Sequence, residues 1–320
     1  GGEYHFLTEI YHPCAGFISG WVSATVGFAA PTALAALTLG SYLAASGLSM
    51  NPTWVATVAI VLLTTAHCTS HRRSGGTQTV FTLLKLILIL GFSAAALLLG
   101  STEHQSDFTW ASDSGALLGS GAFAVSLIYV NYAYSGWNAA TYISGELTSP
   151  QKSLPWVLGI STTVVAVLYC LLNYVFLSVA PMEAMIGKVE IGVIAAEFAF
   201  GSTLGASMGL LLALLLISTI SAMILAGPRV LQRIGQDYPR FAPLARQNQD
   251  GIPVTAILLQ SATALLFLWS ASFEQILIFS GAAMALNTFA TVLGLFVLRW
   301  QQPELRRPFR VSLYPITPLI

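Results

Sequence analysis

The chain has 320 residues, of which 55% are hydrophobic and only 8% are charged, and its formal net charge at pH 7 is zero. Soluble domains carry about 25% charged residues, so this composition excludes an ordinary soluble protein and predicts an all-α polytopic membrane protein. The cysteines Cys14, Cys68 and Cys170 stand singly beside apolar runs, and no histidine has a metal-ligand spacing. We therefore expect no metal, no cofactor and no enzyme chemistry.

Eight apolar segments are long enough to cross about 30 Å of hydrocarbon, at roughly 20 residues each. Pro31 in the first segment would normally kink a helix, although membrane helices tolerate proline when neighbours satisfy the freed carbonyl. The segments are expected at residues 16–46, 53–70, 77–100, 118–143, 154–180, 204–225, 253–271 and 275–298.

The basic residues predict how these segments are oriented. Of the 13 Lys and Arg, 11 follow the ends of the even-numbered segments. By the positive-inside rule, the first segment then starts at the cytoplasm and both ends of this chain are cytoplasmic, most simply in the plasma (cell inner) membrane. The 11 residues are Arg72, Arg73, Lys152, Arg229, Arg233, Arg240, Arg246, Arg299, Arg306, Arg307 and Arg310.

The fourth segment carries small and polar residues at bilayer depth, namely Asn131, Ser135, Gly136 and Asn138. An unpaired backbone group there costs several kcal/mol, so a broken helix needs a reason. One interpretation is that the helix unwinds and presents its amides and carbonyls to a small polar ligand. The other is a continuous helix whose small residues pack closely against a neighbour. These residues alone favour neither interpretation.

Lys85 is the only basic residue expected within a span. An ammonium at that depth costs at least about 2.5 to 3.5 kcal/mol, so it should face the bundle interior and have partners. Snorkelling to the cytoplasmic surface is the less favoured alternative, because Lys85 lies deep along its helix.

The sixth segment offers hydroxyl groups at Ser218, Thr219 and Ser221 before Gly227 and Pro228, where we expect the span to end. Such hydroxyls most often bond to their own helix backbone. The functional alternative is that one or two of them complete a site for a cation or for the lysine.

Three stretches carry a family resemblance. The chain resembles the amino acid–polyamine–organocation (APC) permeases, and is closest to their L-type amino acid transporter branch. GGEYHFLTEIYHPCAGFISGW resembles the start of the third helix of that family, and NYAYSGWNAATYISGELTSPQKSLP its broken sixth helix and the following loop. LRWQQPELRRPFRVSLYPITPLI is similar to the end of the tenth helix and the approach to the eleventh.

The resemblance implies a leucine-transporter-type fold, in which two inverted five-helix repeats hold substrate between broken helices one and six. This chain would form a single transmembrane domain that lacks the first two and the last two helices. Residues 1–117 would be the remaining three helices of the first repeat, residues 118–300 the five helices of the second, and residues 301–320 a cytoplasmic loop and the start of a further helix. We therefore expect an internal piece of a longer transporter, which should not transport by itself.

The resemblance also assigns roles to particular residues. Tyr132 would close over the substrate, and the carbonyls of the unwound stretch would accept from its ammonium. Lys85 would stand where sodium-coupled relatives bind a sodium ion, braced by Ser218 or Ser221, and this positive charge argues against sodium coupling. The implied substrate-binding residues are Tyr132, Ala133, Tyr134, Ser135, Gly136, Trp137 and Asn138.

The function implied is secondary transport of amino acids, with neutral L-amino acids preferred, by sodium-independent exchange or proton symport. Neutral substrates are favoured because the matching stretch offers Tyr, Ser, Trp and Asn but neither a carboxylate nor an Arg. The alternative is a non-transporting membrane sensor or assembly subunit, or an inactive truncated permease. A channel is disfavoured because no charged ring or carbonyl filter motif is present. The partners expected are the amino acid and the lipid bilayer, without nucleic acid, whereas an accessory subunit or a homo-oligomer stays open.

Overall fold

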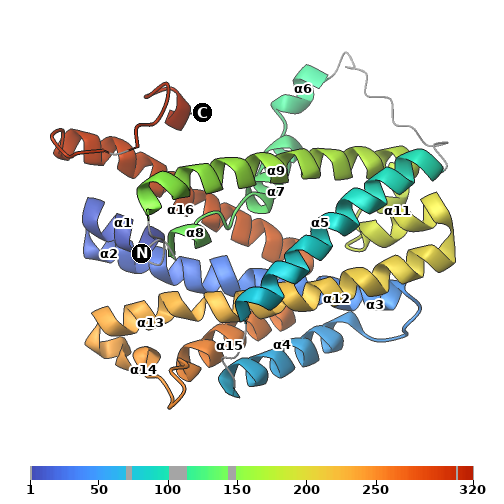
Figure 1. Ribbon diagram of the computed structural model, residues 1–320, viewed down its shortest axis with the longest axis horizontal. Coiled ribbons are helices and arrows are strands. Elements are labelled where there is room, and N and C mark those ends of the chain that lie inside the picture. Colours follow the sequence, from blue (N-terminus) through green and yellow to red (C-terminus); the bar gives the residue numbers. More distant parts are fainter. Residues whose placement is uncertain (1, 70–73, 101–113, 143–148, 308, 320) are drawn as a thin grey trace.

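The computed structural model describes residues 2–69, 74–100, 114–142, 149–307 and 309–319, and every regular element within these ranges is helical (Figure 1). Arg72, Arg73 and residues 143–148 of the loop after the fourth segment lie outside the described residues. In chain order the elements are α1 (Gly2–Ile10), α2 (Pro13–Val22), η1 (Ser23–Ala29), α3 (Ala30–Ala45), α4 (Pro52–Thr69), α5 (Ser74–Leu99), α6 (Ser114–Leu118), α7 (Gly121–Ala133), α8 (Ala139–Tyr142), α9 (Pro150–Val179), α10 (Met182–Met185), α11 (Ile191–Phe200), α12 (Ser202–Ala226), α13 (Pro228–Asp237), η3 (Pro239–Phe241), α14 (Ala242–Ala245), α15 (Val254–Ser270), α16 (Phe273–Gln301) and η4 (Thr317–Leu319).

Six helical runs in the described residues are long and apolar enough to cross a membrane. They match the first, second, third, fifth, sixth and eighth predicted segments, which confirms the all-α, multi-span prediction. The fourth and seventh segments correspond to the shorter helices α7 and α15. The six runs are Pro13–Ala45, Pro52–Thr69, Gln78–Leu99, Pro150–Val179, Ser202–Asp237 and Phe273–Gln301.

The first span contains a π-helical stretch, η1, between α2 and α3. It ends directly before the first turn of α3, where Pro31 stands. Proline has no backbone N–H to donate, so even a regular α-helix would lack one hydrogen bond in the turn before Pro31. The irregular stretch lies at this point. The span therefore stays continuous and the proline does not interrupt it.

The fourth segment is broken, so the first of its two interpretations describes the backbone. Helix α7 ends at Ala133, residues 134–138 form turns, and α8 resumes at Ala139. Gly136 has a φ of +97°, in the left-handed region that L side chains rarely adopt. A Cβ at this position would meet no other atom, so glycine serves the backbone conformation here and not a close contact.

The helix does not end at Gly227 and Pro228, where we expect the sixth span to end. Gly227 keeps helical angles, with φ −63° and ψ −39°, and α13 follows α12 without a gap, in one line across the molecule (Figure 1). Pro228 follows directly and cannot donate a backbone N–H, so the continuous helix lacks one hydrogen bond at this position. Val230, Leu231 and Ile234 are buried, whereas Arg233 on the opposite side is exposed.

Helix α3 lies at the centre of the bundle and packs against α4, α12 and α15. The small buried residues Ala33 and Ala36 of α3, with Ala29 at the end of η1, belong to a core cluster. This cluster also includes Ile220 of α12 and Ile60 of α4. Small side chains allow close helix approach, which is how helices associate when lipid and protein are equally apolar. Helix α5 crosses α12 diagonally (Figure 1).

Helix α11 was not predicted. It has 10 residues, too few to span the bilayer, and its sequence was assigned to a loop. It packs against α12, α9 and α5, and its Val193, Ala195 and Ala196 are buried.

Helix α1 also forms a separate element, which folds back along α2 as a hairpin. The two helices are joined only by Tyr11 and His12, and the His12 imidazole Nδ1 accepts from the backbone N–H of Cys14 at 3.2 Å. Gly16 permits this close approach, since a Cβ there would lie 2.6 Å from the carbonyl oxygen of Tyr4. The hairpin therefore carries the first residues of α1 back to the far end of α2.

No finding tests the predicted orientation, the division into residues 1–117, 118–300 and 301–320, or the inverted repeat. These three remain predictions from the sequence.

We expect Gly16→Ala to destabilise the protein, because its Cβ meets a backbone oxygen that cannot move without disturbing the hairpin. The measurement is the thermal unfolding midpoint of the full-length protein in detergent. Gly91→Ala in α5 is the matched control, since its Cβ would meet nothing within 4 Å. Alanine is favoured over glycine in helices by about 1 kcal/mol, so the control should be neutral or stabilising. Equal midpoints for the two variants would contradict the close approach.

Candidate functional site

The break after α7 is held by hydroxyl groups on both sides. On the α7 side, the Ser135 hydroxyl donates to the carbonyl oxygen of Tyr132 at 2.7 Å. The Tyr169 hydroxyl of α9 donates to the carbonyl oxygen of Ala133 at 3.1 Å, so the last residue of α7 keeps a partner. On the α8 side, the Thr141 hydroxyl donates to the carbonyl oxygen of Asn138 at 2.6 Å. Hydrogen bonds from hydroxyl groups therefore satisfy backbone carbonyls at both ends of the interruption.

Three carbonyl groups at the centre of the break have no backbone hydrogen-bond donor among the described residues. In the part of the chain that the structure describes, no backbone hydrogen bond uses the carbonyl oxygens of Tyr134, Ser135 or Gly136. The hydroxyl of Tyr132 is buried and also finds no partner among the described residues. Polar groups without partners are costly in a membrane protein, so this stretch is suited to a small ligand with donors of its own.

The remaining residues of the predicted site shape this stretch by packing. The Tyr134 ring meets the Tyr169 ring edge to face, with centroids 5.3 Å apart. Trp137 is 37% exposed, whereas Asn138 is buried at 6%. Tyr132 packs beside Ala30 of α3.

A buried carboxyl group that sequence reasoning did not select stands behind the break. Glu3 of α1 is 1% exposed, and its Oε2 accepts from three side chains of other elements. The donors are the Asn138 amide at 3.0 Å, the Asn287 amide of α16 at 2.6 Å and the Ser23 hydroxyl of η1 at 3.3 Å. The only sequence signal for this cluster was an acidic residue beside an apolar span.

Burial raises the pKa of Glu3 above its ordinary value, and the hydrogen bonds from Asn138, Ser23 and Asn287 oppose that rise only in part. Its second oxygen, Oε1, is buried and has no partner among the described residues. All three donors are uncharged, so no positive charge among them favours the ionised carboxylate. The environment favours the neutral acid.

Lys85 is partly buried, and its ammonium donates to the Thr219 hydroxyl of α12 at 2.8 Å. This contact ties α5 to α12 and agrees with the buried interpretation of Lys85 in preference to snorkelling. The hydroxyl that it uses is one of the three in the sixth segment, but not one of the two expected to brace it.

Ser218 and Ser221 point to other partners. Ser218 donates to the side-chain oxygen of Gln78 in α5 at 3.1 Å, and the Ser221 hydroxyl lies 2.8 Å from the imidazole Nε2 of His67 in α4. The expectation that either of them would hold Lys85 is corrected accordingly.

The structure does not join the two parts of the predicted site. Lys85 bonds between α5 and α12, whereas the break is bounded by α7, α8, α9, α16 and, through Glu3, α1. No hydrogen bond between described residues links Lys85 to residues 132–138.

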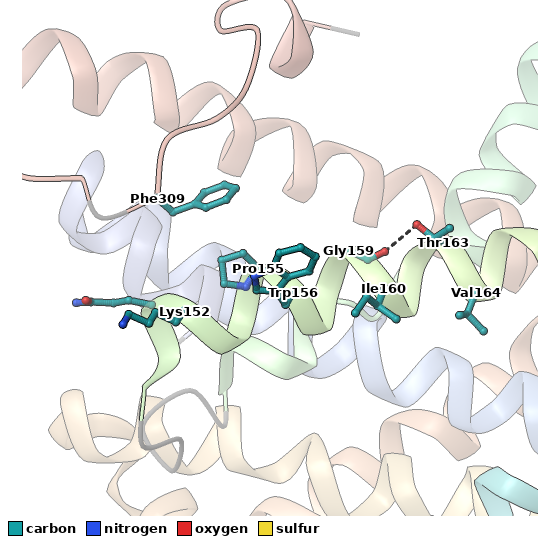
Figure 2. Close-up of a pocket in the computed structure, with 9 residues that line it drawn as sticks. Lys152, Pro155, Trp156, Gly159, Ile160, Thr163, Val164 and Phe309 are labelled. Atoms are coloured by element: carbon teal, nitrogen blue, oxygen red, sulfur yellow. Dashed lines mark hydrogen bonds between the residues drawn. The ribbon is translucent and has the colours of Figure 1, made fainter.

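A separate groove of about 790 Å³ runs along α9, between Lys152 and Val164, with Phe309 across from it (Figure 2). The view shows Pro155, Trp156 and Ile160 along one helix, and the Thr163 hydroxyl bonded to the carbonyl of Gly159 in its own helix at 2.9 Å. The groove includes none of residues 132–138 and offers few polar groups. It is therefore a poorer candidate than the break for a polar substrate.

The sequence profile of the family described as "Amino acid permease" matches residues 1–320. The chain belongs to the amino acid permease family. This confirms the resemblance to the APC permeases, and the family consists of transporters and not enzymes.

Relatives of this permease chain include "Large neutral amino acids transporter small subunit 2" of Mus musculus and of Homo sapiens. Each is 25% identical over 338 residues, and the match covers 100% of this chain and 62% of the relative. The "b(0,+)-type amino acid transporter 1" of Homo sapiens is 26% identical over 330 residues, with 97% of this chain and 65% of the relative covered. The permease chain thus spans less than two thirds of the length of these relatives.

We expect Glu3→Gln to flatten the pH dependence of the permease's thermal stability. Above the ordinary glutamate pKa of about 4.3, the unfolded chain releases its proton before the folded chain does, because the folded-state pKa is raised. The free energy of unfolding therefore falls as the pH rises, until the pH passes the folded-state pKa. Glutamine cannot titrate, so the unfolding midpoint of Glu3→Gln should gain on that of the parent as the pH increases.

The measurement is the unfolding midpoint in detergent across the acidic and neutral range. Glu183→Gln is the control, since Glu183 is exposed and its loss should leave the profile unchanged. Parallel profiles for the parent and Glu3→Gln would contradict the assignment of a raised pKa to Glu3.

Proposed function

We propose that the protein containing this chain is a secondary transporter of neutral L-amino acids that does not depend on sodium. The observation that carries the proposal is the match of the permease family to the whole of residues 1–320. The relatives support it, because their names describe transporters of amino acids, and of large neutral amino acids in two cases.

The break between α7 and α8 supports a role in substrate binding. Its unused carbonyls at Tyr134, Ser135 and Gly136 match the donors of a substrate ammonium, and the buried Tyr132 hydroxyl offers a further polar group. Backbone exposed by a discontinuous helix is a recurrent way for transporters to bind small polar substrates at the bilayer midplane.

The side chains of residues 132–138 support a preference for neutral substrates. They include neither a carboxylate to pair a cationic substrate nor an Arg or Lys to pair an anionic one. The nearest carboxyl group described is Glu3, which already accepts from three donors behind the break.

The position of Lys85 supports sodium independence. The family resemblance places Lys85 where sodium-coupled relatives bind sodium, and its ammonium bonds α5 to α12 through Thr219. We propose that Lys85 is a fixed substitute for that ion.

We also propose that the protein pairs with a second subunit, and this part of the proposal rests only on the names of its relatives. Two of the relatives are named as a small subunit, which implies a larger partner for those proteins.

The test of transport is uptake of radiolabelled leucine by the full-length protein in proteoliposomes. We expect uptake to be the same when choline replaces sodium, and unlabelled leucine, alanine or serine to compete better than arginine or glutamate. Uptake that needs leucine inside the vesicle indicates exchange, and uptake driven by an imposed pH gradient indicates proton symport. A sodium requirement, or stronger competition by arginine or glutamate, would reject the corresponding part of the proposal.

We expect Lys85→Met to reduce this uptake by at least about tenfold, since it removes a buried charge with its hydrogen bond. Folding should survive, because methionine roughly conserves the volume and the Thr219 hydroxyl already lies 3.5 Å from the carbonyl of Leu215 in its own helix. The unfolding midpoint and the uptake rate are measured together. Lys188→Met is the control, since Lys188 is exposed between α10 and α11. Normal uptake by Lys85→Met would remove the residue from the coupling site.

A further inference from the structure

We infer that Glu3 is a positioning residue for the helix break: its carboxyl group fixes the Asn138 side chain, and with it the turn that follows Gly136, against α16. This inference rests on the proposed function, because it assigns to Glu3 a part in shaping the substrate-binding stretch.

The hairpin of α1 on α2 explains how a residue so close to the start of the chain reaches the break. Glu3 returns beside Ser23, at the far end of α2, and the two side chains are hydrogen bonded. At 1% exposure its carboxyl group is removed from solvent, and its contacts come from three separate elements. A buried polar group is maintained only where its partners stabilise it, so these contacts determine where the group lies.

Asn138 is held at two points. Its side-chain amide donates to Glu3 at 3.0 Å, and its carbonyl oxygen accepts from Thr141 at 2.6 Å. The side-chain nitrogen is therefore engaged away from the unused carbonyls of Tyr134, Ser135 and Gly136. Asn138 acts as the anchor of the turn, and the substrate is left to the backbone beside it.

Helix α16 supports both sides of the break. On one side, α7 packs closely against Gly281, since a Cβ at this position would lie 2.6 Å from Ile128. On the other side, Asn287 donates to Glu3 at 2.6 Å. Asn287 comes six positions after Gly281, which corresponds to about 9 Å along a helix. The contact between Gly281 and Ile128 fixes α7 against α16. Glu3 then links Asn287 of α16 to Asn138 through its two hydrogen bonds.

The next residue of α1 limits how far Glu3 can move. The Tyr4 hydroxyl donates to Asp237 Oδ2 of α13 at 2.6 Å, and Arg233 pairs with the same carboxylate at 3.1 Å. Both contacts of this carboxylate are therefore made at α13 and not at the break. Helix α1 is thus tied to α13 by Tyr4 and to the break by Glu3.

The test compares variants of the full-length protein by the KM and maximal rate of leucine uptake in proteoliposomes, together with the unfolding midpoint. Glu3→Leu removes the acceptor shared by Asn138 and Asn287, and we expect KM to rise about tenfold. Glu3→Gln keeps an oxygen acceptor of the same reach and should restore most of the affinity. Since Glu3 acts through Asn138, the double variant Glu3→Leu/Asn138→Ala should have the same KM as Asn138→Ala alone.

A residue that only stabilises the fold gives a different pattern, in which Glu3→Leu lowers the unfolding midpoint and the maximal rate but leaves KM unchanged. That result overturns the inference, as do multiplicative effects of Glu3→Leu and Asn138→Ala on KM. If Glu3→Leu does not fold, Asn287→Leu releases Glu3 from α16 and should raise KM, and an unchanged KM there also overturns it. A parent protein without uptake of any neutral amino acid rejects the proposed function itself, which separates the two failures.

Discussion

Backbone groups that leave a helix inside an apolar bundle need partners, and the residues around the break are arranged to meet this constraint. The carbonyl of Ala133 is met by Tyr169 and that of Asn138 by Thr141, so only the middle of the turn is left open. Each of these partners comes from a helix that must itself be fixed. Helix α9 provides the partner on one side of the turn and α8 the partner on the other.

The buried polar contacts form two groups with different chemistry. Around the break the donors are neutral amides and hydroxyls, and they meet one carboxyl group, Glu3, whose pKa burial raises. Around α12 an ammonium and an imidazole meet hydroxyl groups at Thr219 and Ser221. Because no hydrogen bond between described residues joins the two groups, the proposed substrate site and the proposed charge substitution at Lys85 can be altered separately.

Composition and hydropathy were sufficient to predict the helical membrane fold, and the small and polar residues of the fourth segment correctly drew attention to the break. The sequence could not choose the partner of Lys85, because Ser218, Thr219 and Ser221 lie within four positions and each residue turns the helix by about 100°. Only the packing of α12 decides which hydroxyl faces α5. Glu3 was missed for a related reason, since its partners Asn138 and Asn287 lie 135 and 284 residues away in the sequence. Helix α11 was missed because a length criterion for spans cannot detect a helix of 10 residues.

The continuity of α12 with α13 has a mechanical consequence. A run of 36 residues at about 1.5 Å per residue is roughly 54 Å long, whereas the hydrocarbon layer measures about 30 Å. The run is therefore longer than the layer is thick, and its amphipathic end, α13, carries Asp237, which accepts from the Tyr4 hydroxyl of α1. A tilt of the rigid run would displace α13, and this hydrogen bond would link that displacement to α1.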